Sequence, residues 1–316
     1  MPSTPHRSDL DAVLREVAGL ARPRAEDGEV ADYIEPLASV DPERFAIAAI
    51  DLDGTEHLIG DVDDPLPIQS ISKVFALVLA MQRADAAEGV AEELWQRIGV
   101  EPSGDPFNSL VQLEHERGIP RNPMINAGAL VVHDVLLDHC DDPRGDLVAL
   151  LSELAGDPVE VDEEVLEAEG GTGTRNHAIA NLMAAFGNLT HEVDTVLTDY
   201  IHACAIAMTT RQLARATRFL ANGGVDPASG RRILSPPLAR RVGALMLTCG
   251  TYDAAGEFAF DVGLPCKSGV AGAIIAAAPG RMGLCVWSPP LDEQGNSVAG
   301  HLALHELSER LELSVF

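Results

Sequence analysis

The segment Lys267–Trp287, KSGVAGAIIAAAPGRMGLCVW, carries the pattern that decides the fold. It contains two apolar runs, Ala273–Ala278 and Met282–Trp287, which are joined by Pro279-Gly280. Two short apolar runs around such a pair predict a β-hairpin. The box Lys267-Ser268-Gly269 comes just before the first run and is expected to form its opening residues. The C-terminal part of the chain is therefore expected to contribute strands to a sheet.

A second hairpin is predicted near the N-terminus. Phe45–Leu52 is apolar, Asp53-Gly54 is typical of a turn, and Thr55–Gly60 is expected to form the return strand. Between the two hairpins, residues 85–250 are almost wholly helical in pattern. The helices expected there are Ser109–Arg117, Asn126–Asp138, Asp146–Leu154, Asn176–Phe186, Glu192–Cys204, Thr210–Ala221 and Pro237–Leu247. Others are expected before Pro23, over Ser70–Met81 and over Val298–Leu311.

Strands at both ends of the chain around a helical middle predict an α+β fold. One antiparallel sheet is built from both chain ends, in a domain formed by residues 1–84 and 251–316. A helical domain, residues 85–250, is inserted between these two parts. The two domains are expected to form a single compact unit with the functional site between them.

Composition excludes several classes of protein. The chain has 316 residues, 46% hydrophobic and 22% charged, which is typical of a globular protein. A net charge of -27 argues against nucleic acid and anionic membrane surfaces as partners. Five cysteines without a C-x-x-C pair favour free thiols in a reducing compartment. With no apolar run in Met1–Asp11 and no 18-residue apolar stretch anywhere, we expect a cytoplasmic protein without a membrane span.

Lysine usage points to a catalytic site. The chain has only two lysines against twenty arginines. Lys73 closes the box Gln69-Ser70-Ile71-Ser72-Lys73, and Lys267 opens Lys267-Ser268-Gly269. Arginine supplies surface charge as well as lysine does, but it cannot lose its proton near neutral pH. The two lysines are therefore candidates for tasks that need an ammonium group or a neutral amine.

The spacing of Ser70 and Lys73 predicts a nucleophile beside its base. Side chains three residues apart on a helix project from the same face. A helix N-terminus offers backbone N–H groups to a developing oxyanion. Lowering the pKa of Lys73 by about three units costs roughly 4 kcal/mol, and burial with Lys267 as a second cation is expected to supply the shift. Ser-x-x-Lys alone is weak, because about one match arises by chance in a chain of this length.

Longer boxes carry a resemblance to a known family. They are Val30–Ile34, Gln69–Phe75, Glu101–Gly104, Phe107–Leu110, Asn122–Ala129, Arg175-Asn176, Gly250–Asp253, Gly256–Ala259 and Lys267–Gly272. With these boxes in this order, the chain resembles the bacterial serine-dependent glutaminases, from about Val30 to Phe316. The resemblance implies the β-lactamase/transpeptidase-like fold. It also implies hydrolysis of L-glutamine to L-glutamate and ammonia, with no cofactor and no metal, by a homo-oligomer (dimer or tetramer).

The resemblance further implies a role for each matching residue. Ser70 attacks the side-chain amide to form a γ-glutamyl ester, and Lys73 takes the serine proton. Tyr252 and Tyr33 relay protons to the leaving ammonia. The remaining roles are substrate binding and support: the backbone N–H groups of Ser70 and Val270 form the oxyanion hole, Glu169, Asn126, Asn176, Tyr200 and Tyr252 hold the substrate, and Lys267 and Gln69 support the site. An amino-acid substrate needs an anion for its ammonium group and amide or hydroxyl donors for its carboxylate, which agrees with these assignments.

Two other functions remain open at this point. The Ser70–Lys73 pair with Lys267 is also compatible with a penicillin-binding or β-lactam-hydrolysing enzyme. A glutamine sensor using the same pocket is the third possibility, although an intact nucleophile and base argue against it. Three further signals are given no role. These are the glycine-rich, uncharged loop expected over 170–174, the His301/His305 pair, which has no third metal ligand nearby, and Cys266.

Overall fold

The computed structural model describes residues 7–86, 89–103 and 109–316. Gly104 of the Glu101–Gly104 box and the first half of Phe107–Leu110, Phe107-Asn108, lie outside the described residues. The helices are α1 (Arg7–Ala21), α2 (Glu35–Ala38), α3 (Ser72–Ala86), α4 (Val90–Arg97), α5 (Leu110–His115), α6 (Asn126–His139), α7 (Pro143–Ala155), α8 (Glu163–Thr172), α9 (Thr174–Ala185), α10 (Val193–Cys204), α11 (Thr210–Ala221), α12 (Pro236–Cys249), α13 (Ala255–Asp261) and α14 (Val298–Leu311). The 3-10 turns are η1 (Arg22–Asp27), η2 (Gln69–Ile71) and η3 (Tyr252–Ala254).

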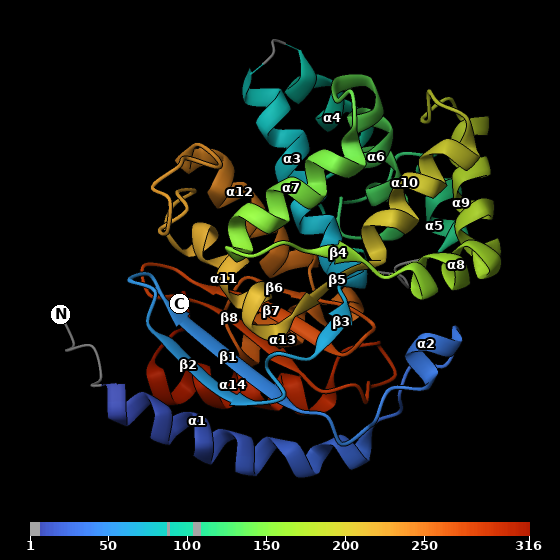
Figure 1. The fold of residues 1–316 in the computed structure, drawn as a ribbon. Coiled ribbons are helices and arrows are strands. Elements are labelled where there is room, and N and C mark those ends of the chain that lie inside the picture. The colour runs from blue at the N-terminus through green and yellow to red at the C-terminus, as the bar shows by residue number, and fades with distance from the viewer. Residues whose placement is uncertain (1–6, 87–88, 104–108) are drawn as a thin grey trace.

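Strands from the two chain ends form one antiparallel sheet of order β2-β1-β8-β7-β6. Its strands are β1 (Ala46–Asp51), β2 (Glu56–Gly60), β6 (Cys266–Ser268), β7 (Ala273–Ala278) and β8 (Met282–Trp287). The N-terminal hairpin joins the C-terminal one through the pairing of β1 with β8. Figure 1 shows the helical middle of the chain stacked on one side of this sheet. The predicted α+β fold with a sheet built from both chain ends is confirmed.

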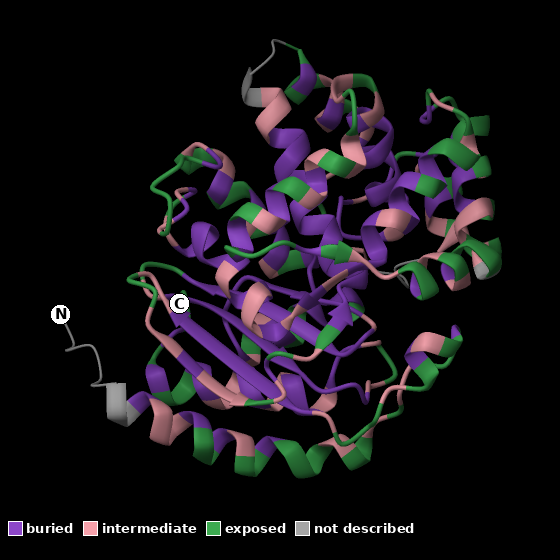
Figure 2. Ribbon diagram, in the orientation of Figure 1, coloured by how far each residue is buried: buried purple, intermediate pink, exposed green. Residues whose placement is uncertain are grey.

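Both faces of the three central strands, β1, β7 and β8, are buried, which explains why these strands are nearly continuous apolar runs. On one face, Ile47, Ile274 and Leu284 pack in a cluster with residues of α1 and α14. On the other face, Ala48 and Ile275 belong to a larger cluster that continues into the helical middle. Successive residues of a strand point to opposite faces, so the two clusters take alternate positions. Figure 2 shows the buried strands between these helical layers.

Helix α11 lies directly on the second face, where it contacts β1, β7 and β8. Gly283 in β8 makes this close approach possible. A methyl group at Gly283 would lie only 2.3 Å from the backbone oxygen of Ala214 in α11.

The division of the chain into residues 1–84 with 251–316 and residues 85–250 stays a prediction. Helix α11 lies inside the second range but packs on the sheet.

A small second sheet was not expected from the sequence. It consists of β3 (Pro65–Pro67), β5 (Ile206–Thr209) and β4 (Glu160–Val161), in the order β3-β5-β4. Its strands have two to four residues, too few to leave a clear periodic pattern. The sheet ties the segment before Ser70 to the segment after α10, since the Ile68 amide donates to Ile206 O at 2.8 Å.

Several boundaries also differ from the predictions. The Ser70 helix begins as the turn η2, and α3 runs to Ala86, five residues past Met81. Helix α8 continues through Gly170–Thr172, so the loop predicted at 170–174 is wrong for most of its length. The Asp162 side chain caps the first turn of α8 and stabilises a helix that its glycines disfavour. Helices α4, α8 and α13 were not predicted.

A buried carboxylate holds the outer part of the helical layer together. Asp134 on α6 is fully buried and is paired with Arg97. It also accepts hydrogen bonds from the backbone amides of Thr190 at 3.0 Å and His191 at 2.9 Å. Burial raises the pKa of this carboxyl, but the hydrogen bonds from Arg97 and the two amides outweigh burial and leave the pKa below its usual value.

We expect Asp134→Ala to lower the free energy of unfolding by about 3–5 kcal/mol, because it leaves the Arg97 charge without its buried partner. The Asp134 pKa is lower in the folded state, so its contribution is complete above the unfolded pKa and is lost as pH falls through the folded value. Urea unfolding at neutral and acid pH measures both effects. Asp138→Ala, one turn further on α6, is the control and should cost less than about 1 kcal/mol. An equal loss of stability in both variants would contradict the stabilising role of the buried Asp134–Arg97 pair.

Candidate active site

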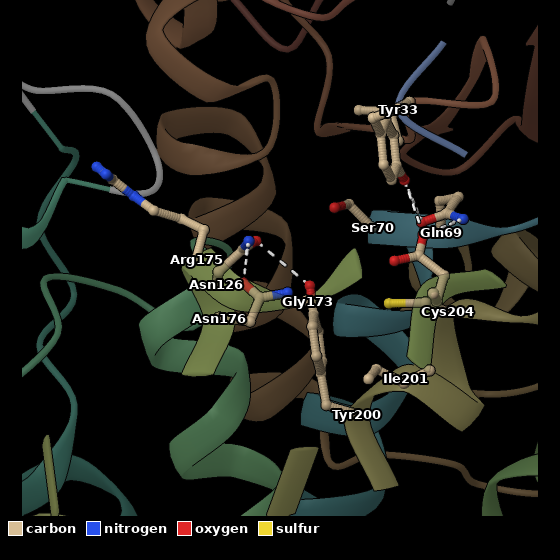
Figure 3. Close-up of a pocket in the computed structure, with 12 residues that line it drawn as sticks. Tyr33, Gln69, Ser70, Asn126, Gly173, Arg175, Asn176, Tyr200, Ile201 and Cys204 are labelled. Atoms are coloured by element: carbon tan, nitrogen blue, oxygen red, sulfur yellow. Dashed lines mark hydrogen bonds between the residues drawn. The ribbon is translucent and has the colours of Figure 1, made fainter. Parts of the chain in front are cut away.

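A cavity of about 330 Å³ contains most of the residues singled out from the sequence. Its lining comprises Tyr33, Gln69, Ser70, Asn126, Glu169, Gly173, Arg175, Asn176, Tyr200, Ile201, Cys204 and Val270. These residues come from segments spread over more than two thirds of the chain. Figure 3 shows the group around Asn126 on one side of the view and Tyr33 with Gln69 on the other.

Ser70 and Lys73 are brought into contact by the start of α3. The Lys73 Nζ lies 3.0 Å from Ser70 Oγ and 2.6 Å from Asn126 Oδ1. A neutral amine in this position donates one N–H to Asn126 and turns its lone pair toward the serine hydroxyl. Gln69, just before Ser70, has a positive φ of 49°, which is uncommon outside glycine. The surrounding structure therefore holds this turn in a conformation that an isolated chain would rarely adopt.

Burial shifts the pKa values of both lysines. It lowers the pKa of Lys73 to about 8, so that a substantial neutral fraction exists near neutral pH. Burial and then the charge of Lys73 hold the pKa of Lys267 well below its usual range. That Lys267 supplies a second cation for Lys73 stays a prediction. Burial is the largest cause of the lowered pKa at both lysines.

The register of the sheet explains why Lys267 reaches the site and Cys266 does not. Lys267 pairs with Ile275 and Cys266 with Ala276. Side chains of paired residues share a face. Ile275 faces the helical layer, whereas Ala276 faces the layer of α1 and α14. Lys267 Nζ lies 4.5 Å from the centroid of the Tyr252 ring, and neither residue is among those that line the cavity.

A negative corner is formed by Glu169, Tyr33 and Gln69. Glu169 Oε1 accepts hydrogen bonds from Tyr33 OH at 2.8 Å and Gln69 Nε2 at 3.0 Å. Burial and then the charge of Glu169 raise the pKa of Tyr33, so this phenol keeps its proton and donates a hydrogen bond to the carboxylate. Glu169 is itself buried at the end of α8.

The opposite corner is built from neutral groups. Asn126 Nδ2 donates to Asn176 Oδ1 at 3.0 Å, and Tyr200 OH donates to Asn126 Oδ1 at 3.3 Å. Burial raises the pKa of Tyr200 well above its ordinary value, so its hydroxyl remains a donor. An acidic corner facing a corner of amide and hydroxyl donors is complementary to an α-amino acid, which carries one ammonium and one carboxylate.

Comparison with known proteins gives the family. The family model described as Glutaminase matches residues 28–316. The chain belongs to the glutaminase family. Relatives named Glutaminase include one from Mesorhizobium japonicum, 51% identical, covering 100% of this chain and 99% of that protein. Another, from Methylobacterium sp. (strain 4-46), is 53% identical and covers 98% and 99%.

Solved structures agree with the sequence comparison. The probable glutaminase ybaS has a TM-score of 0.91 and 32% identity, covering 99% of each chain. A probable glutaminase of Bacillus subtilis has a TM-score of 0.88 and 33% identity, covering 98% of each chain. The predictions of the family, of its fold and of an amidohydrolase acting on glutamine are confirmed. The glutaminase family is thus favoured over a penicillin-recognising enzyme and over a sensor.

Some lining residues were not singled out from the sequence. Arg175 stood in the box Arg175-Asn176, but only Asn176 was carried over from the glutaminases. Cys204 follows Tyr200 by four residues on α10, which places both on one helix face. The position of Cys204 was thus predictable once Tyr200 was placed. Gly173 and Ile201 could not be singled out from the sequence, because they have no polar side-chain group and only shape the cavity wall.

The His301/His305 pair has structural contacts. His301 stacks on Phe258 with ring centroids 4.0 Å apart, and His305 Nδ1 lies 2.8 Å from Asp261 O. Within residues 7–86, 89–103 and 109–316, no group of three or more His, Cys, Asp or Glu side chains is arranged to hold a metal ion. In the same ranges, no helix has the length and apolar character needed to cross a bilayer.

Proposed function

We propose that this protein hydrolyses L-glutamine through a γ-glutamyl ester on Ser70, with Lys73 as the base. The observation that carries the proposal is the contact between Lys73 Nζ and Ser70 Oγ at 3.0 Å, at the wall of a cavity complementary to an α-amino acid. Because burial lowers the pKa of Lys73 to about 8, the neutral amine that the reaction needs is accessible.

In the acylation step, Ser70 Oγ bonds to the amide carbon and its proton passes to Lys73. The carbonyl oxygen becomes an oxyanion, which the backbone N–H groups of Ser70 and Val270 stabilise. The C–N bond breaks when the nitrogen receives a proton, and ammonia leaves. Tyr252 and Tyr33 relay this proton. A water molecule then attacks the ester, and glutamate leaves with Ser70 restored.

Substrate recognition is assigned to the two corners of the cavity. The Glu169 carboxylate pairs with the α-ammonium group, while Tyr33 and Gln69 hold Glu169 in place. Asn126, Asn176 and Tyr200 bind the α-carboxylate. A related structure, described as Mglu in its tris and glutamate form, has a TM-score of 0.87 and 38% identity, covering 99% of this chain and 68% of that one. Glutamate in that relative is in keeping with glutamate as the product here.

A cytoplasmic homo-oligomer completes the proposal. All five cysteines are free, which agrees with a reducing compartment. Apolar side chains stand exposed on the outer helical layer, among them Val111 at 66% and Phe186 at 44%. We assign these exposed apolar side chains to the interface between copies of the chain.

The test of the ester is a partition experiment with hydroxylamine. A common acyl-enzyme must divide between water and hydroxylamine in one ratio, whichever donor formed it. We expect glutamine and a γ-ester of L-glutamate to give the same ratio of γ-glutamyl hydroxamate to glutamate at each hydroxylamine concentration. Ammonia, hydroxamate and glutamate are quantified beside an enzyme-free blank. Ratios that differ between the two donors would rule out a common ester. Ammonia release from glutamine no faster than in the enzyme-free blank would rule out glutamine hydrolysis.

A further inference from the structure

The Asn296 side chain lies between the two segments that carry Tyr252 and Lys267. It is fully buried. Its Oδ1 accepts from Ser268 Oγ at 2.6 Å, and its Nδ2 donates to Thr251 O at 3.3 Å. Ser268 directly follows Lys267, and Thr251 directly precedes Tyr252. One amide group therefore bridges the side chain of Ser268 and the backbone of Thr251.

The same two segments also meet through the carbonyl oxygen of Ser268. That oxygen accepts from Tyr252 OH at 3.3 Å and from Lys267 Nζ at 2.7 Å. Together with the Asn296 bridge, these contacts close a ring that runs from Thr251 through Tyr252 and Ser268 back to Asn296. Tyr252 has a positive φ of 56°, a conformation that persists only where its surroundings hold it.

Asn296 is itself held by a short turn after β8. The backbone N–H of Asn296 donates to Asp292 Oδ1 at 2.9 Å, and the backbone carbonyl oxygen of Asn296 accepts from Asp292 N at 2.8 Å. The turn runs close to the catalytic segments. A methyl group at Gly295 would lie 3.7 Å from the Tyr252 ring and 3.9 Å from Val270. The hydrogen bonds to Asp292 therefore hold the backbone of Asn296 in place, and with it the side chain that contacts Ser268 and Thr251.

We propose that Asn296 is a positioning residue for glutamine hydrolysis, which sets the Tyr252 phenol and Lys267 against Ser70. This inference rests on the proposed function. The site needs one acceptor and one donor at fixed positions, and a carboxamide supplies both. An aspartate of nearly the same shape keeps the acceptor for Ser268 but turns a carboxylate oxygen toward Thr251 O, so the bridge breaks on the Tyr252 side.

The test compares Asn296→Asp with wild-type protein on two substrates. In glutamine, nitrogen leaves only after it gains a proton, so the position of Tyr252 matters. In a γ-aryl ester of L-glutamate, the phenolate leaves without one. We expect kcat for glutamine to fall roughly 10- to 100-fold, KM to change less than about 3-fold, and the ester to be affected much less. Asn188→Asp is the matched control, since the buried Asn188 amide donates to Arg97 O and Gly118 O away from the cavity. This variant should lower Tm without a larger loss of kcat on glutamine than on the ester.

Each outcome has one reading. Unchanged kcat, an equal loss on both substrates or the same split in Asn188→Asp would overturn the inference. Wild-type protein that is inactive on both substrates would instead remove the proposed function. If Asn296→Asp does not fold, Ser268→Ala carries the same test, because it removes the donor to Asn296 Oδ1 and so breaks the bridge on the Lys267 side.

Discussion

We expect Ser70→Ala to lower kcat for L-glutamine by roughly ten thousand- to a million-fold, the order of loss that follows when a member of a serine hydrolase's catalytic unit is removed. Alanine leaves the cavity shape almost unchanged but offers no atom that can form the γ-glutamyl ester. Glutamine binding should survive, because Glu169 and the Asn126 corner are untouched. The measurements are ammonia release and the rise in Tm with added glutamine.

Ser72→Ala is the matched control for Ser70. Ser72 belongs to the same box and is fully buried, but its hydroxyl donates to Gln69 O at 2.7 Å and does not line the cavity. Its loss should cost stability, about 1 kcal/mol for a buried hydrogen bond, and far less activity than Ser70→Ala. A Ser70→Ala protein that keeps substantial turnover would show that another group attacks the amide.

We expect Lys73→Arg to lower kcat nearly as far as removal of the serine does. Arginine keeps the positive charge but cannot become a neutral base near pH 7. In the wild-type protein the base must be deprotonated, so kcat/KM should rise with pH through the Lys73 pKa of about 8. The residual activity of Lys73→Arg should lack this ascending limb, and a full pH profile of both proteins measures it.

Lys73→Met separates base chemistry from charge. Methionine has a similar length, no charge and no proton acceptor of the required strength. Loss of activity in both variants with retained Tm supports Lys73 as the base. Lys73→Arg with wild-type activity would contradict that role and leave Lys73 as a source of charge. An ascending limb that persists in both variants would assign the titration to a different group.

Local patterns accounted for much of the architecture. The strands β1, β7 and β8 were visible as apolar runs because both of their faces are buried, and α14 was predicted with its observed bounds, Val298–Leu311. The pairing of Ser70 with Lys73 follows from three residues of separation at the start of a helix. The short strands β3, β4 and β5 were missed, because two to four residues carry no usable periodicity. Glycines in α8 masked a helix that tertiary contacts stabilise.

What the sequence by itself determined is therefore the two hairpins at the chain ends, the serine–lysine pair and the family boxes, since each depends on neighbours in the chain. Tertiary structure alone decided which distant groups meet. Tyr33 and Glu169 are 136 residues apart, yet they share a hydrogen bond. The direction in which Lys267 points depends on its pairing with β7, and the pKa of Lys73 depends on burial by several elements. Desolvation and hydrogen bonding between remote segments act only after the chain has folded, so no local pattern contains them.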